Sequence, residues 1–184
     1  TLKINQEELK KLQNKISGRK TWLAASTHEG EEEIIINIHK ELKKEFPDLL
    51  TIIAPRHPNR AEEIKLLLNG LNFSQRSKKE NLEDTTEIYL ADSLGELGIF
   101  YSLVNFAFIG GSLIDVGGHN PFEAAQLNCA IISGPKVVNF KEIYKKLNEN
   151  KEKDISLSCK RAYLHHLFFK IITAKRAILQ FGTI

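Results

Sequence analysis

A glycine-rich segment, 110–123, carries the residues with the most evident chemistry in this chain. Two Gly-Gly pairs flank a serine, and the second pair is followed directly by His119, Asn120 and Pro121. Glycine lets a loop approach a ligand without an intervening β-carbon, and proline is favoured at the first position of a helix. A tight strand-to-helix turn needs fewer such residues, so we interpret 110–123 as a ligand-binding loop. Neither the dinucleotide glycine pattern nor the phosphate-loop pattern occurs.

Polar residues also follow two other apolar runs. Arg56 and His57 come after the run 49–54 and lie between two prolines, while His28 follows the run 21–26. The guanidinium of arginine presents a fixed fork of donors that suits phosphate or carboxylate. Taken alone, Arg56 would be an ordinary surface residue, and the acids after His28 would be favourable charges at a helix start. Their position at the ends of apolar runs favours a functional interpretation.

The elements that must hold these residues alternate between strand and helix. Apolar runs separated by helix-like segments predict an α/β fold: a Rossmann-like parallel sheet with helices on both faces. In such a sheet, ligands bind outside the carboxyl ends of the strands, where the polar residues above would lie. The predicted strands are 21–26, 49–54, 72–77 as a short edge strand, 87–91, 106–109 and 130–133.

Five residue pairs have the spacing of a helix-capping box, in which a side chain bonds the third amide and a glutamate bonds the first. Helix N-termini present free amides and partial positive charge, so several at one sheet edge would form an anion site. Asn59 and Asn139 are interpreted as caps alone. The pairs are Ser26 with Glu29, Asn59 with Glu62, Ser93 with Glu96, Asn120 with Glu123, and Asn139 with Glu142.

Composition narrows the function classes. With 184 residues, 42% of them hydrophobic, the chain is one domain or a large half of a two-domain protein. The net charge is +3, but 151–184 holds seven Lys or Arg against two Asp or Glu, which leaves −2 on the remainder and predicts no nucleic-acid-binding face. Two cysteines and no Cys/His zinc spacing argue against a disulfide scaffold and a metal site. No apolar run is long enough for a membrane span.

Taken together, the motifs resemble the 3-deoxy-D-manno-octulosonic acid (Kdo) transferase family. The similarity runs in order through residues 20–148, and its most specific block is Gly-Gly-His-Asn-Pro at 117–121. The other stretches that carry the resemblance are 25–32, 55–58, 92–97, 110–113, 134–135 and 139–140.

The resemblance implies that the chain is the C-terminal, donor-binding half of a GT-B glycosyltransferase. Residues 1–19 would be a helix leading in from the N-terminal half, 20–150 the CMP-Kdo-binding domain, and 151–184 a divergent basic amphipathic tail. The CMP contacts of the family fall on Pro55, Arg56, Leu94, Gly95, Glu96, Asn120, Pro121, Phe122 and Glu123. From their placement, Ser26, His28, Gly111, Ser112 and His119 are further candidate contacts in the cleft.

The implied reaction is inverting transfer of Kdo from CMP-Kdo to a hydroxyl of the lipid A precursor lipid IVA. The general base of the family is a glutamate in the N-terminal half, so we assign no catalytic residue to this chain. No metal or other cofactor is expected, and amides and cations would stabilise the departing CMP. The enzyme would act at the cytoplasmic side of the bacterial inner membrane and reach its acceptor through the N-terminal half.

Some residues depart from the family pattern. Lys136 stands where the family usually has histidine, and Asn128 where it tends to have glycine. The resemblance fades near residue 150, where a packed helix, a membrane-surface helix and a shifted reading frame remain alternatives for 151–184. Two other functions also remain open: a GT-B enzyme that uses a UDP-sugar, and a split fragment that binds nucleotide without turnover.

Overall fold

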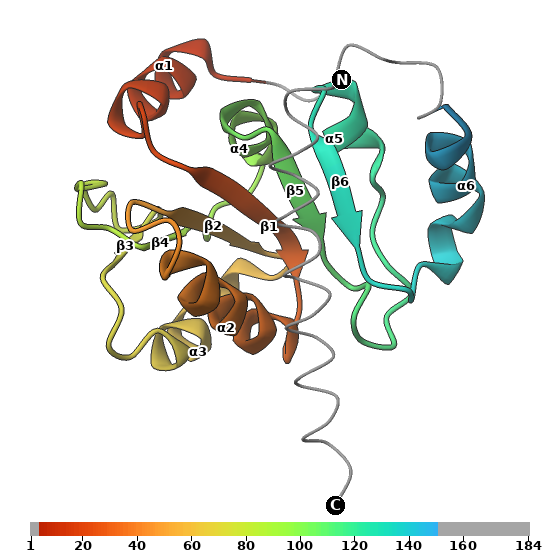
Figure 1. Ribbon diagram of the computed structural model, residues 1–184, viewed down its shortest axis with the longest axis horizontal. Coiled ribbons are helices and arrows are strands. Elements are labelled where there is room, and N and C mark those ends of the chain that lie inside the picture. Colours follow the sequence, from red (N-terminus) through yellow and green to blue (C-terminus); the bar gives the residue numbers. More distant parts are fainter. Residues whose placement is uncertain (1–3, 151–184) are drawn as a thin grey trace, which may run out of the picture.

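The computed structural model describes residues 4–150 and contains a six-stranded, all-parallel sheet (Figure 1). The strand order is β3-β4-β2-β1-β5-β6, which confirms the predicted α/β fold. The short strand expected at 72–77 is present at the sheet edge as β3. The strands are β1 Thr21–Thr27, β2 Leu50–Pro55, β3 Phe73–Gln75, β4 Ile88–Leu90, β5 Phe106–Ile109 and β6 Ala130–Ser133.

Helices cover both faces of the sheet, as the sequence predicts. On one face, α1 and α4 pack together with α5 against the alternate side chains of the strands; on the other, α2 and α3 lie side by side (Figure 1). The helices are α1 Gln6–Lys15, α2 Glu31–Lys43, α3 Ala61–Leu67, α4 Leu97–Leu103, α5 Phe122–Gln126 and α6 Lys141–Asn150, with short 3-10 turns at η1 Pro58–Arg60 and η2 Val138–Phe140.

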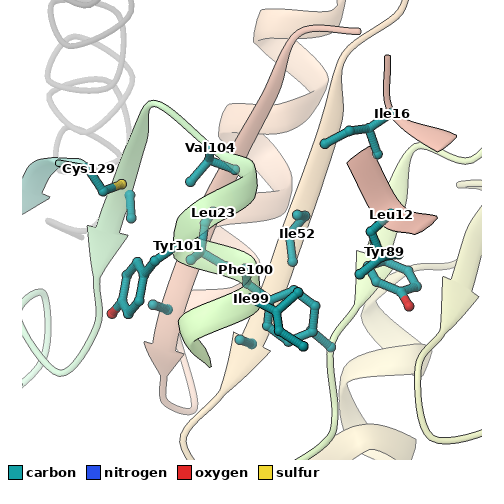
Figure 2. Packing of buried hydrophobic residues seen from close by; sticks show 14 of the residues in the cluster. Leu12, Ile16, Leu23, Ile52, Tyr89, Ile99, Phe100, Tyr101, Val104 and Cys129 are labelled. Carbon is teal, nitrogen blue, oxygen red and sulfur yellow. The ribbon is translucent and has the colours of Figure 1, made fainter. Parts of the chain in front are cut away.

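The central strands are buried on both sides, which explains their continuous apolar runs. In β1, Leu23 faces the α1–α4 side and pairs with Ile52 of β2 and Ala107 of β5. Figure 2 shows Phe100 of α4 among these residues, with Leu12 of α1 in the same cluster. Apolar burial of this extent is the main stabilising contribution to the sheet.

The helix starts differ from the capping-box prediction. Helix α2 begins at Glu31 after Gly30, which has a left-handed backbone and no side-chain cap, so the box at Ser26 is wrong. The boxes at 59, 93 and 139 are also wrong, because those helices start elsewhere or lack the side-chain cap bond. The box at Asn120 is not formed as predicted either, because its Oδ1 accepts the N–H of Phe122, the second residue after it, at 3.0 Å, and α5 begins after Pro121 without a side-chain cap bond.

The connections place a switch point between β1 and β5. From β1 the chain passes to β2 on one side, and it later returns to β5 on the other side of β1. The loops that follow β1 and β5 therefore diverge from neighbouring strand ends, which is the usual position of a ligand site in an open α/β sheet. These loops contain His28 and the segment 110–120.

Among the described residues, no helix combines the length and the apolar character that crossing a bilayer requires. The amphipathic tail predicted at 151–184 lies outside the described residues, as do residues 1–3. A helix is present within the predicted segment 1–19, where the Asn5 side chain accepts the N–H groups of Glu7 and Glu8 at its start.

Candidate donor site

Three histidines from three strand ends meet at the carboxyl edge of the sheet. The rings of His28 and His119 are stacked with centroids 4.9 Å apart, and their Nε2 atoms are 2.7 Å apart. His57, which follows β2, contacts His28 edge-on at 5.7 Å between centroids. The charge of the exposed Arg56 also acts on both rings of the stacked pair. The structure thus brings together the predicted residues after β1, β2 and β5.

Burial keeps the stacked pair neutral. The pKa of His119 is lowered to about 4, chiefly by burial and also by the charges of His28, Arg56 and His57. Burial likewise lowers the pKa of His28. Near pH 7 the contact between the two Nε2 atoms is therefore a hydrogen bond in which one neutral imidazole donates and the other accepts. The outward cation of this cluster is the guanidinium of Arg56.

The first two glycines of the loop permit close approach within the protein itself. A β-carbon at Gly110 would lie 2.2 Å from the carbonyl oxygen of Ser26 in β1. Gly111 has φ +65°, and a β-carbon there would lie 3.1 Å from the ring of His119. The sequence predicts that these glycines allow the loop to approach a ligand. In the structure they allow the loop after β5 to lie directly on β1.

A buried carboxylate joins the same two loops. Glu31, at the start of α2, is 0% exposed. Its Oε2 accepts the N–H of Gly111 at 2.7 Å and of His28 at 3.1 Å, and its Oε1 accepts those of Ser112 and Leu113 at 3.0 Å each. Sequence reasoning treated this acid as a favourable charge at a helix start and missed the contact. The amides of 111–113 are thus already bonded within the protein.

Behind this carboxylate lies a second buried acid. Glu32 accepts a bond from the Thr27 hydroxyl at 2.9 Å and from Arg60 Nη1 at 2.8 Å. Burial raises the pKa of Glu32, and the bond from Arg60 opposes that effect. This network connects the end of β1 to the turn before α3, and so holds the backbone segment that carries His28.

The segment Asn120–Glu123 presents polar and apolar groups side by side. Asn120 is exposed, Pro121 is buried and Phe122 is 50% exposed. Glu123 is half-buried, and its charge helps to raise the pKa of Tyr101, mainly raised by burial. An aromatic ring beside a carboxylate can accept a base or sugar face and its hydroxyl groups.

The predicted contacts after β4 lie in a different setting. Leu94 is 78% exposed, Gly95 has φ +77°, and Glu96 is bonded to Arg76 at 2.6 Å and 3.0 Å. Arg76 also bonds Glu8 of α1 at 3.1 Å and lowers the pKa of Glu96. These charged residues line a groove of about 1040 Å³ that neither Arg56 nor His119 lines. Sequence reasoning missed Arg76, because it lies in a polar loop without a motif.

Three other predicted residues lie at or just after the carboxyl ends of the strands and are buried or half-buried. Pro55 is buried at the end of β2, and Ser112 is fully buried. The Ser112 hydroxyl donates to the carbonyl of Ile109 at 2.6 Å and accepts the N–H of Gly134 at 2.8 Å. Ser26 has φ +55° and is half-buried. Ser112 thus ties the loop after β5 to the end of β6.

Within residues 4–150, no group of three or more His, Cys, Asp or Glu side chains is arranged to hold a metal ion. The three clustered histidines contact one another through their rings and are not arranged as a set of metal ligands.

The parallel sheet, its switch point and the polar loops at its carboxyl edge define a Rossmann-like α/β domain. No family model matches the chain. The structure is similar to the crystal structure of the C-terminal CMP-Kdo binding domain of WaaA from Acinetobacter baumannii, with a TM-score of 0.75 and 30% sequence identity over 94% of this chain and 96% of that one.

Curated proteins show the same relationship. The 3-deoxy-D-manno-octulosonic acid transferase of Haemophilus influenzae is 40% identical over 80% of this chain, and a probable mitochondrial one of Arabidopsis thaliana is 40% identical over 78%. The chain belongs to the Kdo transferase family and has the fold of its Rossmann-like C-terminal GT-B domain. It spans 36% and 33% of the length of these two relatives.

Proposed function

We propose that this chain is the donor-binding half of a Kdo transferase, which holds CMP-Kdo while Kdo is transferred to a lipid A precursor such as lipid IVA. The observation that carries the proposal is the meeting of His28, Arg56 and His119 at the switch point of a sheet that resembles a solved CMP-Kdo binding domain. A cation and imidazole N–H groups at such a place suit a nucleotide phosphate.

The donor phosphate would be bound chiefly by Arg56. This guanidinium is exposed and forms no salt bridge with another residue of the described range 4–150. As the bond to Kdo breaks, negative charge grows on the phosphate of CMP, and a fixed cation beside it lowers the barrier. An N–H of the neutral His28–His119 pair can donate to the same oxygens or to the Kdo carboxylate.

The nucleoside would be held by the segment before α5. The half-exposed ring of Phe122 offers a face for the cytosine or the ribose, and the carboxylate of Glu123 can accept ribose hydroxyl groups. Asn120 and Pro121 shape this segment. Pro55, Leu94, Gly95 and Glu96 complete the proposed CMP contacts through the family resemblance.

The acceptor, the general base and the membrane contact belong to the N-terminal half in this proposal. That half would bring the acceptor to the donor at the cytoplasmic side of the inner membrane. We assign proton abstraction to no residue of this chain, and we propose that transfer needs no metal.

Calorimetry tests the donor specificity directly. The 184-residue chain is titrated with CMP, UDP and NAD in matched buffer. Saturable binding of CMP, at least about tenfold tighter than UDP, supports the proposal, because the pocket must distinguish the base. Equal binding of UDP would favour a UDP-sugar enzyme, and the absence of CMP binding would overturn the proposal.

Turnover separates an enzyme half from a fragment that only binds nucleotide. The chain is mixed with the N-terminal half of a family member, and Kdo transfer to lipid IVA is measured. Transfer by the mixture, but by neither half alone, is the expected result. Nucleotide binding without transfer by the mixture would favour the inactive fragment.

A further inference from the structure

The buried carboxylate of Glu31 occupies the position at which a glycine-rich loop would otherwise offer its amides to a ligand. We infer that Glu31 is a positioning residue of the donor site: it fills the amide nest of Gly111–Leu113 from inside and sets the His28–His119 pair. This inference deepens the proposed function and rests on it only for the nucleotide readout described below.

The hydrogen bonds of Glu31 explain how its carboxylate can be buried away from water. Two oxygens accept four backbone N–H groups, at 2.7 Å, 3.0 Å, 3.0 Å and 3.1 Å. Burial of a carboxylate is costly unless such bonds replace its hydration, and bonds to a charged acceptor are about twice as strong as neutral ones. The carboxylate thus joins segments that are 80 residues apart in the sequence.

The geometry of the histidine pair follows from the shared oxygen. Oε2 accepts the amide of His28 and the amide of Gly111 together. Gly111 lies under the ring of His119, since a β-carbon there would be 3.1 Å from it. The carboxylate therefore fixes the separation of the two backbone segments on which the rings stand, and the 2.7 Å contact between the Nε2 atoms depends on that separation.

The arrangement also limits where the donor phosphate can bind. Successive amides that converge on one point form an anion-binding nest. Here the nest of 111–113 is filled by the protein, and Asn120 bonds the amide of Phe122. The phosphate must therefore be met by outward groups, namely the guanidinium of Arg56 and an N–H of the histidine pair.

Chemical rescue tests the inference without reference to nucleotide. Glu31→Ala removes the carboxylate and leaves a space that formate can enter, and Glu33→Ala is the control, because Glu33 is an exposed acid in the same first turn of α2. Nitrogen NMR of the imidazoles follows the donor and acceptor Nε2 atoms, and hydrogen exchange follows the amides of 111–113.

In Glu31→Ala we expect the paired Nε2 signals to be lost and exchange at 111–113 to accelerate more than about tenfold, because several charge-assisted bonds are removed. Excess formate should restore the paired Nε2 signals and slow the exchange at 111–113 again, and chloride should do neither. Glu33→Ala should match the wild-type chain. Unchanged histidine signals in Glu31→Ala, or the same losses in Glu33→Ala, would overturn the inference.

Glu31→Gln serves where the alanine variant does not fold. It keeps the shape but turns an amide NH₂ toward backbone donors, so the paired Nε2 signals should again be lost, and their retention would count against the inference. Calorimetry with CMP then measures the effect on the site. We expect at least about tenfold weaker binding in Glu31→Ala, recovered with formate.

The wild-type chain titrated with CMP in formate reports any direct competition by that anion. If the wild-type chain binds no CMP at all, the proposed function fails, while the histidine signals and the exchange rates still judge the role of Glu31. Wild-type-like CMP affinity in a Glu31→Ala variant that has lost the histidine signals would overturn the link to the donor site.

Discussion

Arg56 and His119 differ in how firmly the rest of the protein holds them. The ring of His119 is stacked on His28 and rests against Gly111. Arg56 is exposed, and none of the salt bridges among residues 4–150 includes it. The imidazole pair thus provides a rigid surface, and the guanidinium provides a cation that can adjust to a bound anion.

Replacement of Arg56 should weaken nucleotide binding without changing the stability of the fold. In Arg56→Ala we expect CMP affinity to fall about 10- to 100-fold, because a charge-assisted contact to phosphate is lost. The thermal unfolding midpoint should stay unchanged, since no described salt bridge is removed. Lys40→Ala is the control, because it also removes an exposed cation, in the last turn of α2, that forms none of the salt bridges among residues 4–150. Calorimetry and thermal denaturation measure both effects, and unchanged CMP affinity in Arg56→Ala would contradict the assignment.

His39 makes stability depend on pH. It is fully buried in α2, with its Nδ1 2.8 Å from the Thr51 hydroxyl, and burial lowers its pKa to about 4. The unfolded chain binds a proton below about pH 6.5, but the folded chain binds it only near pH 4. The free energy of unfolding therefore falls as pH drops through this window.

From these values His39 should remove about 2 kcal/mol of stability between pH 7 and pH 5. Urea denaturation at the two pH values measures it, and His39→Gln should reduce the difference by about that amount. The other histidines contribute equally to both proteins, so they cancel in the comparison. A pH dependence that is identical in His39→Gln and the wild-type chain would show that this residue is not the source.

The contact of the β5 loop with β1 determines how the switch point is built. Because a β-carbon at Gly110 would lie 2.2 Å from the Ser26 oxygen, there is no room for a side chain at this position. Gly134 is similar, since a β-carbon there would lie 2.1 Å from the carbonyl oxygen of Ser112. These two glycines allow three neighbouring strand ends to lie in contact.

Gly110→Ala should destabilise the protein by about 3 kcal/mol or more, because backbone must move to accept the methyl group. Gly70→Ala is the comparison: Gly70 has φ +81° with open space around it, so only backbone strain of about 1–2 kcal/mol applies. Chemical denaturation of both variants measures the difference. Equal losses would mean that the approach of β5 to β1 is looser than described.

The elements could be predicted where burial alone decides them. The continuous apolar run of β2 and the apolar pattern of β1 predict parallel strands covered on both faces, and the structure confirms them. The helix starts could not be predicted from their capping patterns, because other contacts, some tertiary and some local, use the same side chains. Asn139 donates to the carbonyl of Val116, and Ser93 bonds the Glu96 carboxylate instead of a backbone amide.

In the candidate site, too, some residues could be predicted from the sequence and others could not. His28, Arg56 and His119 could be placed together because each follows a strand, and parallel strands end at one edge. Glu31 could not, because its partners are distant in the sequence and its local setting is that of an ordinary acid near a helix start. Arg76 was missed for a similar reason, since its partners Glu8 and Glu96 are 68 and 20 residues away.

On the scale of the whole molecule, the ligand loops are gathered on one side. All six strands run parallel, so their carboxyl ends, and the loops that follow them, face the same way. The chain spans about a third of the length of its curated relatives. In our proposal, the remaining part supplies the acceptor and the general base opposite these loops.

Removal of metal ions should leave transfer unaffected. The chain mixed with the N-terminal half of a relative is assayed for Kdo transfer before and after treatment with EDTA. We expect equal rates, because Arg56 and the imidazole N–H groups supply the charge stabilisation that a metal would otherwise provide. Loss of transfer on chelation, with recovery on addition of a divalent ion, would contradict this part of the proposal.

The internal carboxylate of Glu31 determines the stage at which the entropic cost of ordering the loop 111–113 arises. The loop it holds is arranged during folding, so nucleotide does not have to immobilise it on arrival. The affinity that would be lost in ordering a mobile loop is therefore retained. Nucleotide association also does not require that loop to close first. In return, a loop already set in place has little freedom to reshape itself around an unfamiliar donor.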